Sequence, residues 1–205
     1  MYIPPSYQQV DFDQALQFVT EYPFGILTTN GEDFPTVTHL PFLIEKEGED
    51  YYLYSHMAKA NPQWKALIDQ QVLAVFVEPH AYISPQYYTR ESVPTWNYVA
   101  VHLAGKATLI EDANGMLELM EKSIRFFDEK QLEQWHKMPN SYVQKLLKGI
   151  VAFRIQITSW QAKEKLSQDR NAVEQQNIVA GLQDSTDSMA QQLGTIMKKK
   201  YNPKI

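Results

Sequence analysis

The most regular hydrophobic pattern in this sequence is an alternation in its last third. Val151, Phe153, Ile155 and Ile157 are apolar, and mostly polar or small residues stand between them. Alternation of this kind is typical of a strand with one buried face. The continuous apolar run at 72–77 has the length of a strand that is buried on both faces. Both segments therefore predict β structure.

Helical spacing appears first near the N-terminus. Asp11 is a suitable N-cap, and Phe12, Leu16 and Val19 follow on one face before Pro23 ends the pattern. Further helices are predicted at 61–68, 112–127 and 142–148, and a weaker amphipathic stripe after residue 180 is interrupted by Gly194.

Turn signals separate the remaining apolar segments. Asn30-Gly31 predicts a tight hairpin between strands at 24–30 and 36–40, and a second turn at 47–50 precedes an aromatic strand at 51–55. We expect 79–95, which contains Pro79, Pro85 and Pro94, to be a structured loop. The segment 98–110 predicts a strand pair or one long strand broken near Gly105. Short strands with helices between them predict an α+β, mainly antiparallel barrel with peripheral helices.

Composition narrows the class of protein. The 205 residues are 44% hydrophobic and 21% charged, which fits one domain, or one domain with a tail. With no cysteine, disulfides, thiolate zinc sites and thiol nucleophiles are excluded. The five histidines lack the spacing of a metal site, so we expect no metal. No signal peptide or membrane-spanning run is evident, which predicts a cytoplasmic protein.

The charge balance argues against a dedicated nucleic-acid-binding protein. The formal net charge is −5, whereas such proteins usually present a basic face. The short basic run 198–200 is typical of a solvated helix end, where cations suit the helix dipole.

Two segments combine residues that suit ligand binding. In Ser55–Trp64, a cation and several donors precede a predicted helix N-terminus, which is favourable for a phosphate group; ordinary helix capping explains the same spacing. In Val93–His102, Trp96 and Tyr98 flank Asn97 and suit stacking on a planar ligand, although core packing is the more frequent use of aromatic residues.

At these same residues the chain resembles the PaiB family of FMN-binding split-barrel proteins, which are described as negative transcriptional regulators. The matching stretches are MYIPPSY, YPFGILTT, HLPF, SHMAKANPQW, AYISPQYY, VPTWNYVAVHLAG and KLSQDR, in this order. The resemblance implies a split-barrel domain over 1–182, followed by a helical tail over 183–205. It also implies FMN as cofactor, bound at a homodimer interface.

The resemblance assigns cofactor contacts residue by residue. Those expected beside the isoalloxazine ring are Thr38, His39 and Leu40. Those expected to hold the phosphate are Ser55, His56, Lys59 and Asn61. Those expected to close the site, from the second subunit, are Trp96, Asn97 and Gln168. The chain departs from the family pattern at Glu164 and Asp169, and each added carboxylate predicts weaker attraction for an anionic cofactor.

Three functions follow from these observations. The first is an FMN-binding regulator, for which the resemblance suggests DNA as a partner although charge and motifs do not support it. The second is a flavin-dependent oxidoreductase related to pyridoxamine-phosphate oxidases. The third is a dimeric binding module that has lost the flavin. The sequence alone does not establish whether the protein is an enzyme.

Overall fold

The computed structural model describes residues 1–9, 11–68 and 70–201. The chain forms two compact units. The central unit contains 16–76 and 102–160, and the terminal unit contains 1–15, 77–101 and the chain from 161 onward. The long strands of the sheet run through both units, and each unit is described by itself below.

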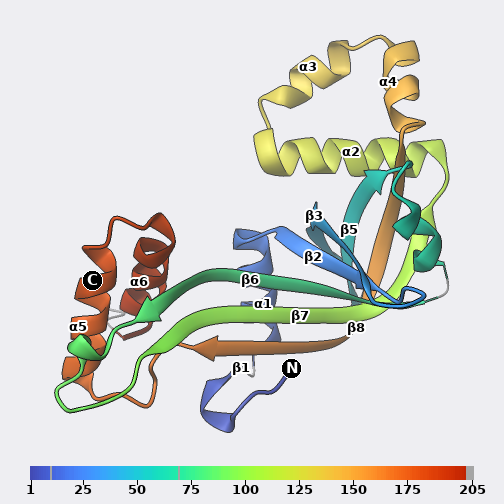
Figure 1. Ribbon diagram of the computed structural model, residues 1–205. Helices are drawn as coiled ribbons and strands as arrows, with labels where there is room; N and C mark the ends of the chain where they lie inside the picture. The colour runs from blue at the N-terminus through green and yellow to red at the C-terminus, as the bar shows by residue number, and fades with distance from the viewer. Residues whose placement is uncertain (10, 69, 202–205) are drawn as a thin grey trace. The chain divides into compact units, whose positions relative to one another are not determined.

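One sheet of eight strands organises the chain (Figure 1). The strands are β1 (Gln8–Gln9), β2 (Phe24–Thr29), β3 (Thr36–Pro41), β4 (Leu43–Glu47), β5 (Asp50–Ala58), β6 (Gln71–Ile83), β7 (Thr95–Ile110) and β8 (Ile150–Lys165). Their order is β3-β2-β6-β7-β8-β5-β4, and β1 pairs with β8. The pairings β2–β3, β2–β6, β4–β5 and β5–β8 are all antiparallel, which confirms the predicted sheet class.

The helices precede, follow or connect these strands. They are α1 (Phe12–Glu21), α2 (Ala113–Asp128), α3 (Gln131–Lys137), α4 (Asn140–Leu147), α5 (Ala172–Gln183) and α6 (Ser188–Tyr201), with short 3-10 helices η1 (Pro5–Tyr7), η2 (Pro62–Leu67) and η3 (Pro85–Tyr87). The predicted caps are confirmed: Asp11 Oδ1 accepts a hydrogen bond from the Asp13 amide at 2.9 Å, and Asp112 Oδ1 accepts one from the Gly115 amide at 2.7 Å. The segment after Asn61 is a 3-10 helix.

One prediction about strand boundaries was wrong, because residues 79–83, expected in a loop, extend β6. Of the two alternatives for 98–110, the single long strand is confirmed as β7, although it has no break near Gly105. Gly105 has another purpose, because a Cβ there would lie 1.8 Å from the Gln156 carbonyl oxygen. The glycine thus allows β7 and β8 to approach each other closely.

The β2–β3 hairpin is confirmed, but its turn is wider than expected. Thr29 pairs with Thr36, so the connection occupies 30–35 rather than the Asn-Gly pair alone. Strand β4 and helices α3 and α5 were not predicted.

The core of the central unit is aromatic and aliphatic. Phe42 and Phe76 meet edge to face, with ring centroids 5.5 Å apart. Phe153 and Ile155, from the alternating segment, are completely buried, as predicted. Gly25 leaves room for the Phe76 ring, since a Cβ at that position would lie 2.5 Å from it. This packing fixes β2 and β6, and thereby β3, on which part of the predicted site lies.

In the terminal unit, α5 and α6 pack against each other (Figure 1). Leu193 and Met197, two members of the weak stripe, are completely buried, which confirms a helix there despite Gly194. The division into a domain over 1–182 and a tail over 183–205 stays a prediction, and the last four residues lie outside the described part of the chain. Within that part, no helix is long and apolar enough to span a membrane.

Candidate flavin site

Two of the predicted cofactor residues are hydrogen-bonded to each other. The Asn61 side-chain amide donates to the Thr38 hydroxyl at 2.9 Å, and its carbonyl oxygen accepts from the Gln63 backbone amide at 3.0 Å. Asn61 therefore caps η2 and links it to β3 at the same time. The Thr38 hydroxyl in turn donates to the side-chain oxygen of Gln63. These bonds position β3 beside η2.

Gln63 is the centre of this network and was not predicted. Its side chain is buried, with a residue exposure of 3%, and its amide donates to the carbonyl oxygens of Leu27 and Thr36 and to the Thr29 hydroxyl at 3.0–3.2 Å. A buried amide that satisfies several strand groups at once holds those strands in a fixed arrangement.

Side chains form hydrogen bonds with backbone carbonyls at both ends of β3. The Gln63 side-chain amide donates to the carbonyl oxygen of Thr36, and the Ser55 hydroxyl donates to the carbonyl oxygen of Pro41 at 2.7 Å. β3 stands at one end of the strand order, so among the described strands its second edge has no paired neighbour. β3 contains the residues expected beside the isoalloxazine ring, and its unpaired edge suits a planar ligand with hydrogen-bonding groups along its rim.

The residues on this edge differ in exposure. His39 is exposed and stacks on Phe24, with ring centroids 6.4 Å apart and planes 22° from parallel. Leu40 is buried opposite Gly25, so its side chain is not exposed to a ligand. The exposed pair of rings gives the edge an aromatic platform.

His56 is half-buried on β5, opposite Ala152. Burial lowers the pKa of its imidazole below the ordinary value, so the ring is neutral at physiological pH. Within the described residues, the imidazole makes no hydrogen bond to protein. A neutral imidazole without a partner can donate to, or accept from, a ligand.

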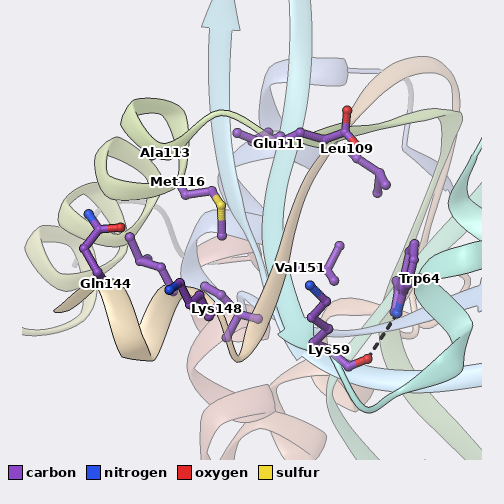
Figure 2. Close-up of a pocket in the computed structure, with 12 residues that line it drawn as sticks. Lys59, Trp64, Leu109, Glu111, Ala113, Met116, Gln144, Lys148 and Val151 are labelled. Carbon is purple, nitrogen blue, oxygen red and sulfur yellow. Dashed lines mark hydrogen bonds between the residues drawn. The ribbon is translucent and has the colours of Figure 1, made fainter. Parts of the chain in front are cut away.

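Lys59 follows β5 and is exposed. Its backbone amide donates to the Gly149 carbonyl at 2.8 Å, and its carbonyl accepts from the Trp64 indole N–H at 3.1 Å. The backbone is thus held from two sides. The side chain lines a cavity of about 380 Å³ (Figure 2), and among the described residues it forms no ion pair.

The helix-terminus part of the phosphate argument is weaker in the structure. η2 has 6 residues and 3-10 geometry, and Asn61 already occupies its first free amide. The Ser55 hydroxyl is likewise engaged by β3. The groups available to an anion in this segment are therefore the Lys59 ammonium and the His56 imidazole.

The other predicted residues lie in the terminal unit. Trp96 is 53% exposed and lies in an aromatic cluster with His80 and Tyr82, at ring-centroid distances of 6.0 and 6.1 Å. Tyr82 is itself 50% exposed. Such exposure of grouped aromatic rings is typical of a binding surface.

Asn97 and Gln168 are engaged within the terminal unit. Asn97 is completely buried, and its amide donates to the Ser167 hydroxyl at 2.8 Å. Gln168 bonds the backbone of its own turn, accepting from the Leu166 amide at 2.7 Å and donating to the Glu164 carbonyl. Both side chains hold the end of β8 in shape. They position this segment rather than present free groups.

The two carboxylates that depart from the family pattern have cationic neighbours. Glu164 forms an ion pair with Lys200, and the Asp169 carboxylate lies 4.0 Å from the Arg170 guanidinium. The charge of Glu164 is thereby compensated, and the repulsion expected from it is reduced. Lys200 belongs to the basic run at the end of α6, and its ion pair with Glu164 was not predicted, because the two residues are far apart in the sequence.

Comparison with known proteins decides the family. The model of the family described as "Putative FMN-binding domain" matches residues 1–159. The protein "Protease synthase and sporulation protein PAI 2" of Bacillus subtilis is 38% identical over the full length of both chains. The chain belongs to the PaiB family. FMN is accordingly the cofactor of this PaiB-type protein.

Solved structures confirm the split-barrel fold of this PaiB-type protein. The flavocytochrome Anf3 from Azotobacter vinelandii superposes with a TM-score of 0.61 at 19% identity, covering 77% of this chain and 69% of that one. The FAD and heme binding protein from Mycobacterium smegmatis gives a TM-score of 0.61 at 17% identity, covering 85% of this chain and 80% of that one. At these identities the likeness concerns the fold alone.

Proposed function

We propose that this protein binds FMN along the outer edge of β3, with the phosphate at Lys59 and His56. The terminal position of β3 is the observation that carries the proposal, because it leaves one edge of the strand unpaired and the His39 ring exposed to a planar ligand. The Lys59 ammonium complements the phosphate charge. Asn61 and Ser55 act by positioning these elements.

The proposal includes a homodimer in which the partner completes the site. A flavin lying on an open strand edge stays exposed on its other face unless a second surface covers it. The Trp96 cluster is such a surface, since its rings are grouped and about half exposed. In this arrangement Trp96 contacts the cofactor, while Asn97 and Gln168 hold the segments that carry it.

The biological role that we propose is regulation, exerted in the cytoplasm through a flavin-dependent signal. FMN supplies redox chemistry when it is bound, and the protein binds and orients it. Direct action on DNA has little physical support, because the chain carries a net charge of −5. Regulation through a change in protein contacts fits the acidic chain better.

Spectroscopy and binding measurements on the purified full chain test this role. A regulator of the proposed kind shows a flavin spectrum with FMN, a dimeric mass in light scattering, and no specific DNA binding at physiological salt. Rapid turnover of flavin reduction by NADH or NADPH would instead support the oxidoreductase alternative. A monomer that binds FMN fully would contradict the shared site.

A further inference from the structure

The cavity beside Lys59 has the character of a small-molecule site of its own. Its volume of about 380 Å³ falls within the usual range for ligand pockets. Its wall combines aliphatic side chains with a few polar groups from α2, α4 and the segment after β5. Among the predicted cofactor residues only Lys59 lines it, so the cavity extends beyond the flavin site proposed above.

Two lysines face this cavity without acidic partners. Lys59 and Lys148 both line it, and neither forms an ion pair in the part of the chain that the structure describes. In the same unit, by comparison, Lys122 forms ion pairs with Glu45 at 2.7 Å and Glu118 at 2.8 Å. Two ammonium groups without ion-pair partners beside an apolar cavity can bind an anion.

The backbone brings these lysines together. In the β5–β8 ladder Ala58 pairs with Ile150, and the Lys59 amide donates to the Gly149 carbonyl at 2.8 Å. Lys148 is the residue before Gly149, and its own amide is held by the Gln144 carbonyl at 3.3 Å. The strand register therefore brings the backbone of Lys59 close to that of Lys148, and both side chains line the cavity.

The apolar part of the cavity suits an aromatic ring. The Trp64 indole forms one wall and is fixed by its hydrogen bond to Lys59 (Figure 2). From α2, the Met116 thioether points into the space between that wall and the helices (Figure 2). Indole and thioether groups both make favourable contacts with aromatic ligands.

We propose that this cavity binds an aromatic monocarboxylate, with its carboxylate at Lys59 and Lys148 and its ring between Trp64 and Met116. Glu111 also lines the cavity, so the three charged groups there sum to one net positive charge, which a single carboxylate neutralises. A dianion such as a phosphate ester would exceed that charge. Because Lys59 is shared with the proposed phosphate site, occupancy by the acid weakens FMN binding.

Isothermal titration calorimetry of the full chain with indole-3-acetate as probe tests the proposal. We expect saturable binding of the acid and binding at least about tenfold weaker for the neutral indole-3-acetamide, since a charge-assisted contact is lost. Lys148→Gln reduces affinity for the acid to the level of the amide, and Met116→Trp, which fills the cavity, abolishes binding of both. Lys145→Gln is the matched control, because Lys145 is exposed on α4 and does not line the cavity.

Equal affinity for acid and amide, or equal effects of Lys148→Gln and Lys145→Gln, would overturn the proposal. FMN titration of the Lys148→Gln variant separates this outcome from the flavin proposal. Lys148 is not assigned to the cofactor, so the variant retains the FMN affinity of the unmodified protein.

Discussion

The Asn61 amide reaches across to the Thr38 hydroxyl at 2.9 Å, joining the turn after β5 to the edge of β3. Two residues that the family resemblance assigns to different parts of the cofactor thus hold one another in place. Asn61 also caps η2 with its carbonyl oxygen. The side-chain amide therefore links the turn to β3, whereas the side-chain carbonyl caps η2, and substitutions can distinguish these two interactions.

Asn61→Ala removes both interactions, and Asn61→Asp keeps only the cap. We expect Asn61→Ala to cost about 1 kcal/mol of folding stability, and Asn61→Asp to cost less, because a carboxylate remains a good cap. FMN affinity should instead fall more in Asn61→Asp than in Asn61→Ala, since the introduced carboxylate repels the phosphate. Denaturant melts measure the stability of the two variants, and FMN titrations measure their affinity. If Asn61→Ala were the weaker variant in both experiments, the segment would act on stability alone.

Gln63→Leu tests the buried network directly. The substitution leaves the carbonyls of Leu27 and Thr36 and the Thr29 hydroxyl without their partner. A buried polar group without a hydrogen-bond partner costs about 1–3 kcal/mol. We therefore expect Gln63→Leu to lower the free energy of unfolding by roughly 3 kcal/mol or more in chemical denaturation. Gln71→Leu, at an exposed position of β6, should change stability by less than about 0.5 kcal/mol. Similar losses in the two variants would rule out a special role for Gln63.

Ser167 has a positive φ of 62°, which is unfavourable for a residue with a Cβ. Its hydroxyl bonds Asn97, so the strain is offset by a buried interaction. Ser167→Ala keeps the strain and loses the bond, whereas Ser167→Gly loses both. We expect the glycine variant to be more stable than the alanine variant by about 1 kcal/mol, measured by thermal denaturation. The reverse order would contradict the backbone assignment.

His56 makes stability depend on pH. Burial lowers its pKa in the folded state below the value of 6.5 in the unfolded chain. The unfolded state then binds the proton more tightly, so this contribution is complete above pH 6.5 and is lost as the pH falls through the folded pKa. Melting temperatures between about pH 8 and pH 5 should decline less steeply for His56→Gln than for the unmodified chain. The exposed His80→Gln serves as control, and an unchanged slope for His56→Gln would refute the prediction.

The elements that the sequence predicted well are those with a local signal. The alternation around Phe153 and Ile155 and the caps at Asp11 and Asp112 need no distant partner to be interpreted. The extension of β6 past Pro79 could not be predicted in this way, because it depends on pairing with a neighbouring strand.

The site shows the same division between local and distant signals. Lys59 and Asn61 stand in a recognisable segment, but Gln63 gains its role only from carbonyls of β2 and β3 that lie far away in sequence. Asn97 and Gln168 were expected to face a ligand, and the structure shows their side chains bonded within the terminal unit. Ser167 was missed because a serine gives no signal of positive φ.

Titration of the apoprotein with FMN, followed by the quenching of flavin fluorescence, tests the central claim most directly. Lys59→Gln should weaken binding by roughly tenfold or more, because a charge-assisted contact to the phosphate is lost. Lys65→Gln, which removes an exposed lysine of η2, should leave the affinity unchanged. Riboflavin, which lacks the phosphate, should not distinguish the three proteins. Equal FMN affinity in the unmodified and Lys59→Gln proteins would contradict the phosphate assignment.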